Sequence, residues 1–241
     1  RPSTPIAGKT DETFIGGNNG SLTNVTTAME YKQGASGDWT DIVDTSVTGL
    51  APGTYYVRVK ATTTAFASEL QTVTIAAFNA ASEPTPAAEV DYAAEQLTGL
   101  EPNGVYDIDG TTVTADSSGK ATINGSWLGK SISVVKKGNG TTTADSSEQT
   151  LSLPARSAAP VGISVTDITY NGANDGSIFN LNVTMEYRKG NDGPWTRATG
   201  TSVVGLENGD YYVRVAATES SFASIPAQVT IHDSNATIPE A

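Results

Sequence analysis

Apolar and polar residues alternate along many short stretches of the chain. Tyr55, Val57 and Val59 share one face of a predicted strand, and the intervening residues are polar or amphipathic. The same two-residue period recurs at residues 73–75 and 211–215. No segment carries apolar residues at helical spacing over several turns, so the pattern predicts an all-β chain with very little helix.

The alternation belongs to a module that occurs twice. Residues 20–75 align with residues 176–231 without a gap at a constant offset (176 − 20 = 156), and about half of the aligned positions are identical. Most identical positions are of core or turn type; they include Met29, Glu30, Tyr31, Trp39, Gly49, Leu50, Gly53, Tyr55, Tyr56, Val57, Arg58, Val59, Phe66, Ala67, Ser68, Val73 and Ile75. The sequence between the copies is unrelated, which predicts an array whose period is a module plus a spacer domain.

Turn residues divide the chain into domains. Glycine, asparagine and proline interrupt the predicted strands at short intervals, which is typical of β-sandwiches. Stretches rich in Ala, Ser, Thr and Pro lose the alternation and are predicted linkers. We predict tandem small sandwich domains, with two homologous copies flanking a different small all-β domain: first module 1–77, linker 78–88, middle domain 89–154, linker 155–160, second module 161–233 and tail 234–241.

Composition narrows the class of protein. The 241 residues suffice for three domains of about 75 residues, and no cysteine is present to form disulfides or thiolate metal sites. The net charge of −12 argues against binding to nucleic acid or to anionic membrane surfaces. No apolar stretch approaches the ~20 residues of a membrane span. The first residues look like an interdomain linker, so we expect an internal fragment of a longer protein.

The strongest resemblance lies in residues 47–61. There Gly49-Leu50-Ala51-Pro52-Gly53 precedes Tyr55-Tyr56-Val57-Arg58-Val59, and residues 203–217 repeat the run. It resembles the turn and penultimate strand of fibronectin type III and related immunoglobulin-like domains. The resemblance implies that the leucine and the inward tyrosine close the bottom of a sandwich. The spacing between them is one residue shorter here, the modules lack the usual second-strand tryptophan, and they are shorter than that family's norm.

A second resemblance concerns the setting. The Gly37-Asp38-Trp39-Thr40 hairpin and residues 127–142 look like repeat modules of large secreted and wall-anchored proteins of Gram-positive bacteria. This resemblance implies an extracellular location, secreted or attached to the cell wall, beside catalytic, adhesion or surface-anchoring domains.

Catalytic chemistry has little support in the sequence. The single histidine, His232, precedes Asp233 near the end of the last predicted strand and has no counterpart in the first copy. No serine lies in a nucleophile motif with a partner base. We therefore expect no enzyme activity, no cofactor and no metal.

Aromatic residues are the candidates for ligand binding. Trp39 and Trp195 occupy equivalent positions, and together with Tyr56 and Tyr212 on the outer face they could form a flat platform for sugar rings. The alternative is that each tryptophan folds over its hairpin and caps one edge of the sandwich. Both interpretations also apply to Trp127 in the middle domain.

Two further features have a structural alternative. The loops at residues 17–20 and 172–176 superficially resemble calcium loops, but they carry too little charge for a tight site, which favours simple turns. Lys136 and Lys137 could contact an anionic wall polymer or could lie on a solvated hairpin. A Lys–Asn isopeptide crosslink lacks support from the repeat, because Lys60 corresponds to Ala216.

Three hypotheses for function follow. The leading one is a non-catalytic spacer segment that positions other domains of an extracellular bacterial surface or secreted protein. The second is a module that binds carbohydrate or host glycoprotein in adhesion or substrate targeting. The third is an accessory part of a large secreted hydrolase or protease. In each case we expect a monomer whose main partners are neighbouring domains of a longer chain.

Overall fold

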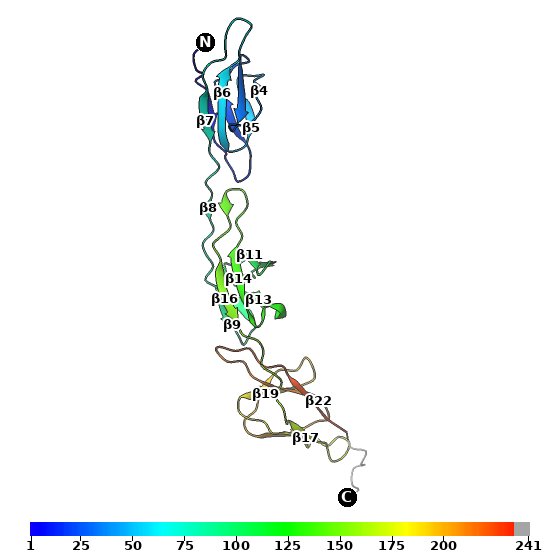
Figure 1. The fold of residues 1–241 in the computed structure, drawn as a ribbon. Coiled ribbons are helices and arrows are strands. Elements are labelled where there is room, and N and C mark those ends of the chain that lie inside the picture. Colours follow the sequence, from blue (N-terminus) through cyan, green and yellow to red (C-terminus); the bar gives the residue numbers. More distant parts are fainter. Residues whose placement is uncertain (234–241) are drawn as a thin grey trace. The chain divides into compact units, whose positions relative to one another are not determined.

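The computed structural model describes residues 1–233, which form short strands joined by turns and irregular loops (Figure 1). The one helical element in this range is the 3-10 turn Gly125–Trp127. The prediction of an all-β fold is therefore confirmed. The described residues form two compact units: residues 1–85 with 136–147, and residues 86–135 with 148–233. The predicted tail 234–241 lies outside the described residues.

The first module is a seven-stranded sandwich. One sheet has the order β1-β2-β5 and the other β4-β3-β6-β7. Their bounds are β1 Gly8–Thr10, β2 Gly20–Thr23, β3 Met29–Gln33, β4 Thr40–Asp41, β5 Val47–Leu50, β6 Gly53–Val59 and β7 Gln71–Ile75. All neighbouring strands are antiparallel, with Tyr31 opposite Val57 and Tyr55 opposite Val73.

The two-residue period decides which side chains enter this core. Tyr55 and Val57 point inward and are 2% and 0% exposed, while Tyr56 and Arg58 between and beyond them lie on the outer face. They pack with inward residues of both sheets, a cluster that comprises Ala7, Leu22, Val25, Ile42, Leu50, Val73 and Ile75. Burial of this apolar surface is the main source of stability in a domain without disulfides.

A tyrosine fixes the crossing from β5 to β6. The Tyr55 hydroxyl donates to the Ala51 carbonyl at 2.8 Å, and in the second module the Tyr211 hydroxyl donates to the Glu207 carbonyl at 3.1 Å. This is the tyrosine corner of immunoglobulin-like sandwiches, in which the ring is buried and its hydroxyl bonds to backbone a few residues upstream. The shorter leucine-to-tyrosine spacing thus leaves the corner intact.

One glycine permits a close approach between the sheets. A Cβ at Gly20 would lie 2.5 Å from Ile75 Cγ2 and 3.0 Å from the Leu50 carbonyl oxygen, and Gly176 is equally confined by Ile231. A larger residue at either position would force β2 or β18 away from its neighbours.

The second module repeats the fold. Its sheets have the orders β17-β18-β21 and β20-β19-β22-β23. The bounds are β17 Ser164–Thr166, β18 Gly176–Phe179, β19 Met185–Lys189, β20 Thr196–Arg197, β21 Ser202–Leu206, β22 Gly209–Val215 and β23 Ala227–Ile231. Ile178, Tyr211, Val213 and Ile231 are central to its core.

The middle domain has the same strand order despite its unrelated sequence. Its sheets are β9-β10-β13 and β12-β11-β14-β16, so the first, second and fifth strands form one sheet, as in the modules. The bounds are β9 Glu89–Asp91, β10 Gln96–Thr98, β11 Val105–Ile108, β12 Thr111–Thr114, β13 Ala121–Thr122, β14 Lys130–Lys136 and β16 Gln149–Leu153. The chain therefore consists of three sandwiches of one topology.

The predicted linker 78–88 contains a short strand. β8 (Ala81–Ser82) pairs in parallel with β15 (Thr143–Ala144), which lies in the loop after β14. The Glu83 amide donates to the Ala144 carbonyl at 3.0 Å, and Lys136 Nζ lies 2.7 Å from a Glu83 carboxylate oxygen. These contacts make residues 136–147 part of the same compact unit as the first module.

Candidate functional site

The outer face of the four-stranded sheet carries the predicted aromatic residues of the first module. The register of β3 and β6 sets Lys32 opposite Tyr56 and Glu30 opposite Arg58. Trp39, just before β4, covers this face: the Arg58 guanidinium carbon lies 3.8 Å from the ring centroid and Lys32 Nζ lies 5.3 Å from it. The indole is thus held by cation–π contacts over the sheet.

The second module has the same arrangement. The guanidinium carbons of Arg214 and Arg188 lie 3.9 Å and 4.5 Å from the Trp195 ring centroid, and that of Arg188 also lies 5.7 Å from the Tyr212 ring centroid. In the first module Lys32 similarly lies 6.0 Å from the Tyr56 ring centroid. In each copy one cation therefore connects the tryptophan to the tyrosine.

Ion pairs orient the arginines beneath the indoles. Arg58 Nε donates to Glu30 Oε1 at 2.6 Å, and Arg214 Nε donates to Glu186 Oε1 at 2.7 Å. Both pairs are mostly shielded, with Glu side chains 14% and 13% exposed. A charge-assisted bond of this kind fixes the plane of the guanidinium, and with it the seat of the ring.

This geometry bears on both interpretations of the tryptophans. Each indole is half-buried and lies on the sheet face, where an arginine stacks against it. A sugar ring would have to use the remaining exposed surface or displace the guanidinium. The surface consists of Trp39, Tyr56, Lys32 and Arg58, and of their equivalents in the second module; we refer to it as the indole surface.

Trp127 has a different environment. It ends the 3-10 turn and is 2% exposed in the core of the middle domain. Its ring contributes to packing there and lies outside the indole surface.

His232 has a defined partner at the end of β23. Its backbone amide donates to Asp167 Oδ1 at 2.7 Å, and its Nδ1 lies 3.2 Å from the same oxygen. The backbone bond, followed by the ring, holds the pKa of Asp167 below its usual range. In the first module Asp11 takes the corresponding position: its Oδ1 accepts from the Ala76 amide at 2.7 Å, and Ala76 stands where the second module has His232.

In the two loops that resemble calcium sites, the side-chain oxygens of Asn19 and Asp175 accept hydrogen bonds from nearby residues of the same module. Asn19 Oδ1 accepts from the Thr13 amide, and in the second module both Asp175 carboxylate oxygens accept from Thr169. No group of three potential metal ligands occurs within residues 1–233. The basic pair is engaged as well, since Lys136 lies beside Glu83 and Lys137 beside Asp145.

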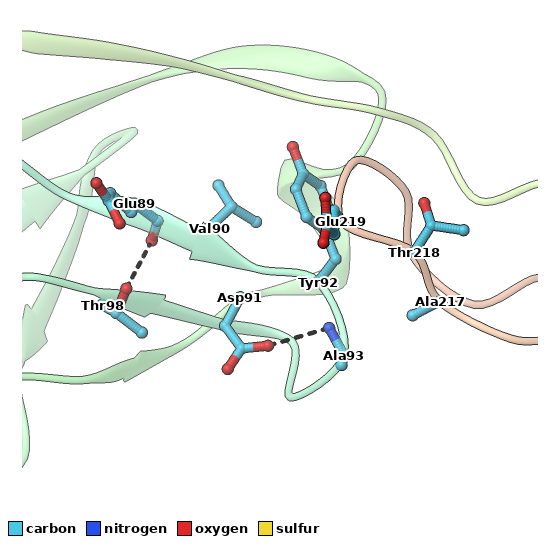
Figure 2. Close-up of a pocket in the computed structure, with 9 residues that line it drawn as sticks. All are labelled: Glu89, Val90, Asp91, Tyr92, Ala93, Thr98, Ala217, Thr218 and Glu219. Carbon is cyan, nitrogen blue, oxygen red and sulfur yellow. Dashed lines mark hydrogen bonds between the residues drawn. The ribbon is translucent and has the colours of Figure 1, made fainter.

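An open depression lies between the middle domain and the second module within their shared compact unit. Glu89 to Ala93 and Thr98 line one side, and Ala217 to Glu219 line the other (Figure 2). Asp91 turns its carboxylate toward the Ala93 amide, which donates to it at 3.1 Å. This acid is therefore used to shape the β9–β10 turn.

Next to this depression lies a junction that the sequence did not predict. Phe222 is 2% exposed and belongs to the core cluster of the middle domain, where its ring centroid lies 5.0 Å from that of Tyr92. Arg156 Nη1 donates to the Ala223 carbonyl at 3.0 Å, and Nη2 pairs with Glu95. The sequence did carry a sign of it, because Phe222 is identical to Phe66 although both fall outside the alternating strands.

Comparisons with known proteins add little to the geometry. No protein-family profile and no curated protein matches the sequence. Among solved structures, the chain is similar to the FN1–FN3 domains of chicken CNTN1, with 16% identity, 95% of this chain and 99% of that chain covered, and a TM-score of 0.29. A similarity at this level carries no argument about function.

The strand order and the tyrosine corners describe the fold by themselves. The modules are fibronectin-type-III-like in fold. Among the described residues of these fibronectin-type-III-like domains, no helix is long and apolar enough to cross a membrane.

Proposed function

We propose that these domains form a non-catalytic spacer segment of an extracellular bacterial surface or secreted protein, in which they set the distance and orientation between other domains. The main support is the fastened second linker. Arg156 bonds to the Ala223 carbonyl and to Glu95, and the Ser157 carbonyl accepts from the Ile225 amide at 3.0 Å. A linker that is bonded to both neighbouring domains restricts hinge motion between them. A spacer requires such a restriction.

The chemistry of the polar residues supports a non-catalytic role. His232 is bonded to Asp167 at the end of a strand, and the arginines Arg58 and Arg214 of the indole surface form ion pairs with Glu30 and Glu186. The extracellular bacterial setting rests on the resemblance to repeat modules of Gram-positive proteins. We expect a monomer whose partners are the adjoining domains of its own chain.

The spacer role can be tested by distance measurements across the junction. The chain has no cysteine, so spin labels at Ser117→Cys and Thr199→Cys report on the middle domain and the second module alone. We expect a distance distribution about as narrow as that of a pair within the middle domain, Ser117→Cys with Thr150→Cys. A distribution as broad as that of a flexible tether would contradict the proposal.

Phe222→Ala provides the matched variant for this measurement. Removing the ring from the core of the middle domain should broaden the distribution across the junction and leave the pair within the middle domain unchanged. An equally narrow distribution in the variant would mean that Phe222 does not fix the linker.

A second candidate function is glycan binding at the indole surface. The observation in its favour is that both modules hold a half-exposed tryptophan and a tyrosine around one cation in the same geometry. Two equivalent weak sites would gain by avidity on a polymer.

This candidate has its own test. The chain is titrated against cell-wall polymers, plant polysaccharides and mucin-type glycans, with the Trp39→Ala/Trp195→Ala double variant as control. Binding that disappears in a variant of nearly unchanged melting temperature supports a glycan site. Absence of binding in a folded chain leaves the spacer proposal alone.

A further inference from the structure

Phe66 in the first module is 77% exposed, whereas its repeat equivalent Phe222 is 2% exposed. An exposed aromatic ring forgoes a large hydrophobic contribution. Because about half of the aligned residues are shared, this contrast between identical residues calls for a local cause.

Loop conformation is not that cause. In the first module the Thr62 amide donates to the Ala65 carbonyl at 2.9 Å, and in the second the Thr218 amide donates to the Ser221 carbonyl at 3.0 Å. A serine then closes each loop in the same way: Ser68 Oγ accepts from the Val59 amide and Ser224 Oγ from the Val215 amide, both at 2.9 Å. The two loops therefore present their phenylalanines alike.

The difference lies in what adjoins the ring. Phe222 is covered by the middle domain, through Tyr92 at 5.0 Å between ring centroids and Arg156 at 5.8 Å from its guanidinium carbon to the ring centroid. The middle domain precedes the second module in the chain. In the first module nothing among the described residues covers Phe66 in this manner.

In the unit that contains the first module, a loop of the middle domain makes the corresponding contact with the domain that precedes it. Residues 137–148 connect the sixth and seventh strands of the middle domain, and within this loop Ser146 Oγ accepts from the Lys136 amide at 2.9 Å, as the serines above do. In this loop the Thr141 carbonyl accepts from the Ile15 amide of the first module at 2.8 Å. In both units, the loop between the sixth and seventh strands therefore meets the domain that precedes it.

We propose that the Phe66 loop, residues 62–68, is a docking surface for a domain of the middle type placed directly before the first module. Such a domain supplies an aromatic ring equivalent to Tyr92, and an arginine equivalent to Arg156 in the connecting segment. At the repeat offset of 156, Arg156 corresponds to the position immediately before Arg1. The inference rests on the spacer proposal and extends it to a specific partner.

A tandem chain tests the docking directly. Residues 1–156 are joined in front of the complete chain 1–241, so that Arg156 of the upstream block precedes Arg1 and a middle domain lies directly before the internal first module. Phe66→Ser in the upstream block makes the two copies of the loop distinguishable by mass. Amide hydrogen exchange is then measured for the loop around the internal Phe66.

We expect exchange in the internal loop to slow by at least about tenfold relative to the same loop in the chain 1–241, and to approach that of residues 218–223. Tyr92→Ala with Arg156→Ala in the upstream block should abolish this protection. Unchanged exchange of the internal loop beside a protected 218–223 loop would overturn the docking proposal. Exchange that is equally fast in both loops would overturn the spacer proposal as well.

A second copy of the chain is the competing occupant. If the Phe66 loop of the chain 1–241 becomes protected as protein concentration rises, the surface serves self-association, and the proposed partner is wrong. Protection that appears in the tandem and does not depend on concentration supports the proposal.

Discussion

Tyr55 and Tyr211 combine a buried ring with a single backbone hydrogen bond. Burial raises the pKa of both phenols above the usual range, because the phenolate would lose its hydration. The hydroxyl bond closes the corner between the sheets in both modules. The two residues are therefore matched probes of the same interaction.

Tyr55→Phe and Tyr211→Phe should each lower the free energy of unfolding of their own module by about 1 kcal/mol, the usual net value of such a bond. Urea unfolding provides the measurement, and Tyr56→Phe on the outer face is the control. A loss in the control as large as in the corner variants would mean that the backbone bond is unimportant.

Asp11 and Asp167 make the modules sensitive to acid. The Lys9 side-chain bond and then the Ala76 amide lower the pKa of Asp11, while the His232 amide lowers that of Asp167. A carboxyl whose folded pKa lies below its unfolded value of about 3.9 stabilises the fold at higher pH, and this stabilisation is lost as pH falls through the folded pKa.

The difference in melting temperature between the native chain and the Asp11→Asn/Asp167→Asn variant should accordingly be present above about pH 4 and vanish at lower pH. Asparagine keeps an acceptor for the strand-end amide but has no charge to titrate. A difference that stays constant from pH 7 to pH 2 would show that the two carboxylates contribute no linkage.

At the level of single residues, the sequence predicted which side chains point into the core. It did not predict which side chains contact one another across neighbouring strands. The two-residue period identified Tyr55 and Val57 as core. The seat of Trp39 depends on the register that brings Lys32 and Arg58 beneath it, and a pattern along one strand does not specify register.

At the level of strands and loops, the sequence predicted the class of the middle domain but not how its strands pair. The middle domain was predicted to be all-β, but its strand order could not be deduced because its sequence does not align with the modules. Pairing of β8 with β15 was also unpredicted, since two-residue strands carry too little pattern to be recognised.

The loops after β6 and β22 offer the sharpest contrast between elements. Phe222→Ala should destabilise its unit by roughly 3–5 kcal/mol, the usual range for a phenylalanine removed from a core. Phe66→Ala in the chain 1–241 should change stability by less than about 0.5 kcal/mol, as for other exposed positions. Chemical denaturation of the two variants checks this, and equal losses would contradict the burial difference.

On the scale of the whole molecule, the repeating unit is a module followed by a middle domain, and two kinds of contact join neighbouring domains. One is polar and uses a parallel strand pair with Lys136 and Glu83; the other is built on Phe222, Tyr92 and Arg156. The sequence revealed the period, because a constant offset needs no structural knowledge. It did not reveal the junctions, because they are made by residues that belong to different domains.

Trypsin cleavage at Arg156 can report on the second linker. It is the single lysine or arginine between Lys137 and Arg188, so trypsin has one possible cleavage site in that linker. A protease must draw the side chain into its specificity pocket, and Arg156 is already bonded to Ala223 and Glu95. Cutting at Arg156 should therefore be slow in the native chain and fast in Phe222→Ala. When the junction opens and closes faster than trypsin cuts, the cleavage rate reports the fraction of chains in which the junction is open.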